Sequence, residues 1–147
     1  MVDILHKIGV EGVAAGDVFE ALTTTDGLAG WWATDTSGDE RVGGVLTFRF
    51  ALGSIEVKVA QLEPGRSVRW AVVGGPEEWL GTTVTFDLRP DGDYTTVLFG
   101  HRGWREPVEF MHHCSTKWAV FLLSLKSLLE TGKGAPEPLD VKIDSWN

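Results

Sequence analysis

Three adjacent residues, His112, His113 and Cys114, have side chains that bind metal ions or act as nucleophiles. They lie in a segment with helical periodicity, where neighbouring side chains point about 100° apart. Three consecutive helical positions therefore cannot direct their side chains at one ion. His112 and Ser115 share a helix face, but the pattern positions no carboxylate to orient the histidine, which argues against a hydrolase triad. Cys114 falls on the apolar face, so we interpret it as a small buried hydrophobic residue rather than a nucleophile.

His101 has a stronger case for contact with a ligand. The alternating pattern of residues 95–102 places it on the same side as Val97 and Phe99, close to the start of the predicted long helix. A buried imidazole needs a hydrogen-bond partner or a ligand. Two interpretations remain open, a histidine satisfied by backbone or water near the sheet edge and a ligand contact, and we favour the first.

The acidic residues and the short motifs assign no catalysis. Glu77, Glu78, Glu106 and Glu109 lie in predicted loops or at the start of the helix, where a negative charge favours the positive end of the helix dipole. No carboxylate pair is placed for acid–base chemistry. The sequence contains no phosphate-binding glycine loop and no HExxH, CxxC or GxSxG motif. We therefore assign no catalytic residue, no metal ligand and no cofactor.

Aromatic residues are unusually frequent, with seven tryptophans and seven phenylalanines in 147 residues. Core packing explains each one singly, but together they exceed what one sheet–helix interface needs. Cavities for flat apolar ligands are lined in this way, with few polar groups. We expect an open cavity whose entrance is framed by three tryptophans from loops, Trp32, Trp79 and Trp104. The full set of candidate lining residues is Trp32, Phe48, Phe50, Trp70, Trp79, Phe99, His101, Trp104, Phe110, Cys114 and Trp118.

A long helix, predicted over about 108–131, supplies one wall of this cavity. Apolar residues recur at the i, i+4, i+7 spacing of one helix face, with Phe121 and Leu125 among them. Pro107 precedes the segment and Gly132 follows it, as expected for a helix start and a C-terminal cap. The opposite face is predicted to carry Lys117, Ser124, Lys126 and Glu130.

The rest of the chain is predicted to be mostly strands. Alternation of apolar and polar residues predicts strands at 4–10, 45–50, 55–62, 68–72, 82–88 and 95–102. Helical spacing predicts short helices at 14–22 and 27–32, and the polar, glycine-rich segment 33–44 is predicted to be a loop. This order favours an α+β fold in which a curved antiparallel sheet wraps around the long C-terminal helix. Residues 132–147, rich in proline and glycine, are expected to form a loosely packed tail.

Length and charge narrow the function classes. The 147 residues fit one domain, 1–147, which includes the tail. The net charge of −8 and the scattered basic residues argue against nucleic acids and anionic membranes as partners. No apolar run reaches the roughly 20 residues that span a bilayer, and the N-terminus does not resemble a signal peptide. The single cysteine excludes an intrachain disulfide, and we expect a cytoplasmic protein.

Several stretches resemble a known family. They are VFEALTTTDGLAGWW, VLFGHRGW, the tail GKGAPEP and the helix pattern Cys114, Trp118, Phe121, Leu122, Ser124, Leu125 and Lys126. In order and spacing the chain resembles the START-like (SRPBCC) helix-grip superfamily, and within it the family of Aha-type activators of the Hsp chaperone ATPase, over roughly residues 4–138. The resemblance implies a deep cavity between the sheet and the long helix.

Three functions are compatible with these observations. We expect binding of a small hydrophobic or aromatic molecule in the cavity. A chaperone partner is the first alternative, since the resembled family is named after co-chaperones, whose matching domain works beside an N-terminal domain that this chain has no room for. A cyclase or dehydratase is the second alternative, because the wider superfamily includes such enzymes. Here only His101, with a nearby glutamate, could serve that chemistry.

Overall fold

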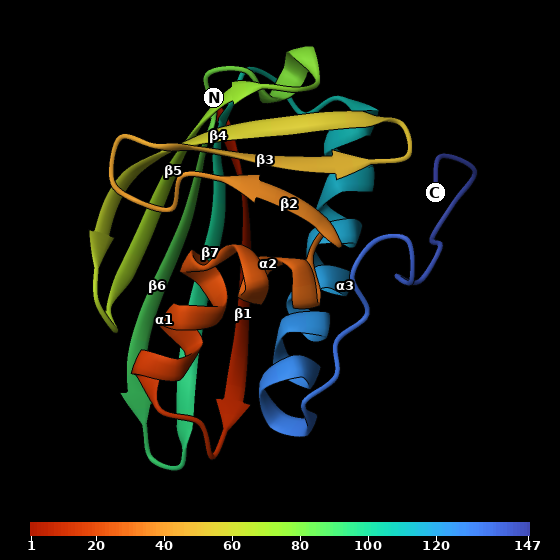
Figure 1. Cartoon of the computed structure of the whole chain (residues 1–147). Helices are drawn as coiled ribbons and strands as arrows, with labels where there is room; N and C mark the ends of the chain where they lie inside the picture. Colours follow the sequence, from red (N-terminus) through yellow and green to blue (C-terminus); the bar gives the residue numbers. More distant parts are fainter.

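One seven-stranded antiparallel sheet dominates the computed structural model, which describes all of residues 1–147 (Figure 1). Two short helices follow the first strand, and one long helix follows the last. The elements are β1 (Val2–Glu11), α1 (Ala15–Thr23), α2 (Thr25–Trp31), β2 (Asp35–Gly38), β3 (Val45–Phe50), β4 (Gly53–Glu63), β5 (Ser67–Gly74), the 3-10 turn η1 (Glu77–Trp79), β6 (Thr83–Asp91), β7 (Tyr94–Trp104) and α3 (Glu109–Thr131).

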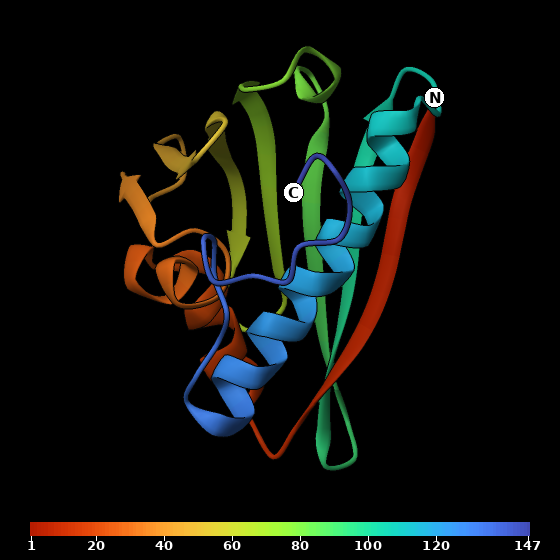
Figure 2. The same ribbon diagram turned by 90° about the vertical axis from the view of Figure 1, so that its right-hand side faces the viewer.

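The sheet order is β1-β7-β6-β5-β4-β3-β2, so the first strand lies at one edge of the sheet and pairs with the last strand. Ile4 of β1 lies opposite His101 of β7, and all strand pairs are antiparallel. The sheet curves, and α3 runs across its inner side while α1 and α2 close one end (Figure 2). This is the predicted α+β helix-grip architecture.

The strand predictions from alternation are confirmed by the burial of the side chains. In β4, Ile55, Val57 and Val59 are buried whereas Glu56 and Lys58 are exposed. Because successive strand residues point to opposite faces, one face of the sheet is covered and the other meets solvent. The covered face forms one continuous core with α1, α2 and α3.

The long helix forms where its periodicity predicts it. Leu122 and Leu125 are fully buried on its inner face, and Phe121 is 5% exposed. The helix ends at Thr131 and is capped by Gly132, whose φ of 87° places it in the left-handed region that glycine adopts without a steric penalty.

The predicted loop 33–44 contains a short strand, which corrects the prediction. Thr36 of β2 pairs with Phe48 of β3 at the edge of the sheet. The sequence DTSG of β2 is polar and mostly exposed, so it has no apolar alternation from which a strand could be recognised. Backbone hydrogen bonds to β3 hold it in place.

The expectation of a loosely packed tail is also wrong. Residues 132–147 run back along α3 and over the open side of the sheet (Figure 2). The Glu137 N–H donates to the Trp32 carbonyl at 2.8 Å, and the Thr34 N–H donates to the Glu137 carbonyl at 3.2 Å. Ser124 of α3, predicted to face solvent, is buried under the tail, and its hydroxyl oxygen accepts a hydrogen bond from the Ala135 N–H at 2.7 Å.

Candidate ligand-binding pocket

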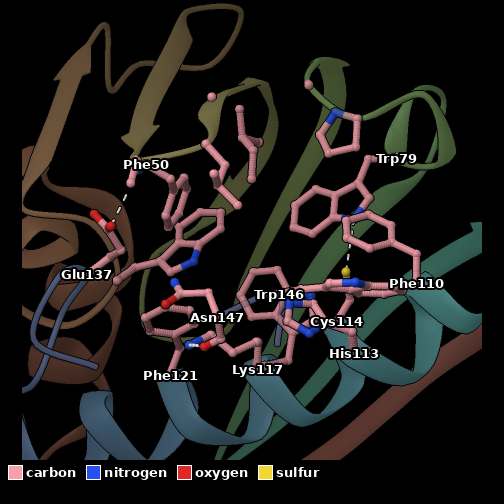
Figure 3. Close-up of a pocket in the computed structure, with 18 of the residues that line it drawn as sticks. Phe50, Trp79, Phe110, His113, Cys114, Lys117, Phe121, Glu137, Trp146 and Asn147 are labelled. Atoms are coloured by element: carbon pink, nitrogen blue, oxygen red, sulfur yellow. Dashed lines mark hydrogen bonds between the residues drawn. The ribbon is translucent and has the colours of Figure 1, made fainter. Parts of the chain in front are cut away.

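A pocket of about 600 Å³ lies between α3, the β3–β4 turn, the segment before η1 and the tail (Figure 3). Eleven of its 20 lining residues are hydrophobic, and large aromatic side chains contribute much of the surface. The lining residues are Trp32, Phe50, Ala51, Leu52, Gly53, Ser54, Ile55, Gly75, Pro76, Trp79, Phe110, His113, Cys114, Lys117, Trp118, Phe121, Glu137, Asp140, Trp146 and Asn147.

The structure divides the eleven candidate residues from the sequence into two groups. Six of them line the pocket, namely Trp32, Phe50, Trp79, Phe110, Cys114 and Trp118. The other five do not line it and are buried in the core, namely Phe48, Trp70, Phe99, His101 and Trp104. Core and pocket wall are in contact, because the Phe99 and Trp118 ring centroids are 4.6 Å apart and Trp32 stacks on Trp70 at 6.0 Å.

The predicted entrance of three tryptophans is not formed as expected. Trp104 is only 1% exposed and lies behind Trp79, with 6.5 Å between the ring centroids. Its indole N–H is the one buried side-chain nitrogen that has no hydrogen-bond acceptor. Trp32 and Trp79 do line the pocket, and each packs against Trp118 on α3.

Both ring nitrogens of His101 form hydrogen bonds with side chains rather than with the backbone or water. The Trp118 indole N–H donates to His101 Nδ1 at 3.1 Å, and His101 Nε2 lies 2.8 Å from the Thr82 hydroxyl. The Thr82 hydroxyl itself donates to the Trp79 carbonyl at 2.6 Å. Because an indole nitrogen only donates, Nδ1 must be the acceptor and Nε2 carries the proton. Burial lowers the pKa of His101 to about 3, so the imidazole is neutral at pH 7.

Cys114 is also held in its uncharged form. Burial raises the pKa of its thiol to about 12, and the Trp79 indole N–H, 3.4 Å from the sulfur, opposes this shift only in part. A thiol with this pKa has almost no thiolate at neutral pH and is a poor nucleophile. The geometry therefore agrees with the interpretation of Cys114 as a buried hydrophobic residue.

One buried ion pair fixes the tail against α3. Lys117 was predicted to face solvent, but it is 9% exposed and its ammonium group pairs with the fully buried side chain of Asp140. The same ammonium group donates to the Val141 carbonyl at 3.0 Å and the Asn147 carbonyl at 3.2 Å. Three acceptors use all three of its protons. Lys142 adds a second contact to Asp140, at 3.3 Å.

A second polar link joins the tail to the beginning of α3. His113 Nδ1 lies 2.7 Å from a carboxylate oxygen of Asp144, and this hydrogen bond holds the pKa of Asp144 below its usual value. The rings of His113 and Phe110 stack, and Trp146 packs against both. Figure 3 shows Phe110, His113 and Trp146 on one side of the pocket and Glu137 on the opposite side.

Comparison with known proteins decides the family. The family described as activator of Hsp90 ATPase homolog 1-like protein matches residues 13–130, which is most of the chain. The chain belongs to this family. No curated protein matches the sequence. None of the helices combines the length and apolar character required to cross a membrane.

Solved structures share the fold of this AHSA1-like chain. The Aha1 dimer from Colwellia psychrerythraea is 46% identical, with a TM-score of 0.84, and the match covers 91% of this chain and all of that one. Protein SSP2350 from Staphylococcus saprophyticus is 20% identical, with a TM-score of 0.75 and coverage of 90% and 95%. CalU16 from Micromonospora echinospora is 22% identical, with a TM-score of 0.71 and coverage of 92% and 78%. The last two similarities show the fold alone.

Sequence reasoning missed the contribution of the tail to the pocket of this AHSA1-like protein. Glu137, Asp140, Trp146 and Asn147 all line it, and they lie beyond the part of the chain that the family match covers. Trp146 was the available signal, because a tryptophan in a polar terminal segment usually finds a surface to pack against. Lys117 gave no such signal, since a lysine at that position fits an exposed helix face equally well.

Proposed function

We propose that this AHSA1-like protein binds a small, mainly apolar or aromatic molecule in the pocket between the sheet and α3. The observation that carries the proposal is the size and chemistry of the pocket. Its volume of about 600 Å³ is within the range of small-molecule sites, and its walls include the rings of Trp32, Trp79, Trp118 and Phe121.

The energetics of such binding are favourable but modest. A planar ligand that buries roughly 200–300 Å² of apolar surface gains about 5–8 kcal/mol by transfer out of water. Association then costs translational and rotational freedom, which offsets part of that gain. We expect dissociation constants in the micromolar to millimolar range for ligands that make no specific polar contact.

Tryptophan fluorescence tests this proposal directly. Four of the seven tryptophans line the pocket, so a bound aromatic ligand should quench or shift the emission. The variant Ala51→Trp places a large side chain at an exposed position of the pocket wall and should abolish binding with little change in stability. The matched control is Ala60→Trp, because Ala60 is exposed on β4 and does not line the pocket.

The outcomes separate binding from packing. Emission and thermal-unfolding shifts with several aromatic compounds, lost in Ala51→Trp and kept in Ala60→Trp, would support the proposal. The absence of any shift across a panel of aromatic ligands would leave the pocket as a feature of packing without a ligand.

The family match favours a second candidate function, interaction with a chaperone. The family is described by activation of the Hsp90 ATPase, and the proposal for this chain is that it contacts such an ATPase. Measuring the ATPase rate of a purified Hsp90-type chaperone with increasing amounts of this protein tests it. A rate that does not change at a several-fold molar excess would remove this candidate.

A further inference from the structure

Glu137 is a carboxylate without a counter-ion in the pocket wall. The residue is 7% exposed, and no lysine, arginine or histidine forms an ion pair with it. Its side chain accepts only one hydrogen bond, at 3.4 Å, from the N–H of Ala51 to Oε1 (Figure 3). Buried carboxylates are normally paired or accept several hydrogen bonds, so this one has unused acceptor capacity.

The cation in the same pocket is not available to Glu137 or to a ligand. All three protons of Lys117 are donated to Asp140, Val141 and Asn147. An anionic ligand would therefore have to break the buried ion pair to Asp140 to reach this ammonium group. A ligand with a hydrogen-bond donor can bind to the carboxylate of Glu137 without breaking any ion pair.

Aromatic residues line the same pocket as this carboxylate and are its neighbours through backbone hydrogen bonds. The backbone N–H of Glu137 donates a hydrogen bond to the Trp32 carbonyl. Its side chain accepts one from the N–H of Ala51, the residue after Phe50. The ring centroids of Trp32 and Phe50 are 5.8 Å apart, and those of Phe50 and Phe121 are 6.5 Å apart. The faces of aromatic rings attract cations, and a carboxylate in the same pocket wall offers them a hydrogen-bond acceptor.

From these three observations we propose that the pocket takes an organic cation, with an apolar or aromatic body and a protonated amine that binds beside Glu137. The inference rests on the proposed function and deepens it by naming the ligand class. The overall charge of −8 also favours the approach of a cation. In the complex, the amine donates to the free acceptor sites of the Glu137 carboxylate while its apolar body contacts the rings of Trp32, Phe50 and Phe121.

Three probes that share a naphthalene body test the charge preference. They are 2-naphthylmethylamine, 2-naphthalenemethanol and 2-naphthoate, and their binding at pH 7 is measured by calorimetry. We expect the amine to bind at least about tenfold more tightly than the alcohol, since a hydrogen bond between two charged groups is stronger than a neutral one. The carboxylate should bind most weakly.

The variant Glu137→Gln isolates the contribution of the carboxylate, because it keeps the shape of the side chain and removes the charge. The affinity for the amine should fall to that for the alcohol, and the affinity for the alcohol should not change. The matched control is Glu56→Gln, which removes one negative charge at an exposed position on the outer side of β4 and should leave all three affinities unchanged.

The outcomes distinguish this inference from the proposed function. Equal affinities for amine and alcohol in the unaltered protein, or tightest binding of the carboxylate, would overturn the inference and leave a pocket for neutral or anionic aromatic molecules. The inference is also overturned if Glu56→Gln lowers the affinity for the amine as much as Glu137→Gln does. If none of the three probes binds, the proposed function fails together with the inference.

Discussion

At the scale of single residues, the interior of this protein fixes one histidine in one protonation state. His101 accepts from an indole N–H on one side and faces a threonine hydroxyl on the other. A proton on Nδ1 would meet the indole N–H of Trp118 head-on, in a site that water does not reach. Desolvation and the hydrogen-bond pattern therefore act in the same direction, and both favour the neutral ring.

The lowered pKa of His101 predicts a pH dependence of stability. Its pKa is about 3 in the folded protein and about 6.5 in an unfolded chain, so between these values only the unfolded chain binds the extra proton. The stabilisation is complete above pH 6.5 and is lost as the pH falls towards 3, by about 1.4 kcal/mol per pH unit from this residue.

Chemical denaturation at several pH values measures this slope. The variant His101→Gln, which cannot titrate, should lose the contribution of His101, and the remaining slope belongs to carboxylates such as Asp144. Nitrogen chemical shifts of the His101 ring should report the Nε2–H tautomer throughout pH 4–8. A ring that titrates near pH 6.5 in the folded protein would contradict the hydrogen-bond assignment.

At the scale of elements, α3 supplies the main test of the packing. Leu125→Ala removes a fully buried side chain and should lower the free energy of unfolding by about 2–5 kcal/mol. Leu123 lies two residues away on the same helix and is 57% exposed, so Leu123→Ala should cost less than about 0.5 kcal/mol. Equal and small losses in the two variants would mean that the buried face of the helix is wrongly assigned.

Much of this element order could be predicted because burial leaves a periodic signal. The alternation around Ile55, Val57 and Val59 and the helical recurrence around Phe121 and Leu125 both identified elements that the structure contains. β2 gave no signal, because an exposed edge strand needs backbone pairing but no apolar face. The path of the tail was invisible for a related reason, since polar contacts such as that of Asp140 with Lys117 have no period.

The candidate site could be predicted only in part for a geometric reason. Alternation predicts that the side chains of Phe50 and Phe99 both point to the inner face of the sheet. It does not show which of the two lines a pocket and which packs against other side chains. That depends on how far α3 stands from each strand, and hence on the packing of the whole molecule. The polar end of the pocket, at Glu137, depends on the tail and lay outside any periodic pattern.

At the scale of the whole molecule, the net charge predicts that the protein does not bind nucleic acids. The chain has 21 acidic and 13 basic residues, and nothing in the sequence concentrates the basic ones in a stripe. Because counterion release dominates binding to nucleic acids, this protein should not retard DNA or RNA even in low salt, where such binding is strongest. Salt-sensitive micromolar binding in a mobility-shift assay would contradict this prediction.

The position of β1 between solvent and β7 has a consequence for how the chain is made. Ile4 leaves the ribosome early, but its partner His101 is synthesised 97 residues later, as the register of the two strands requires. At roughly 5–20 residues per second, β1 waits about 5–20 s for the strand that pairs with it. During that time its backbone donors and acceptors have no native partner, so the nascent protein passes through a long interval in which it is open to aggregation or to capture by folding factors.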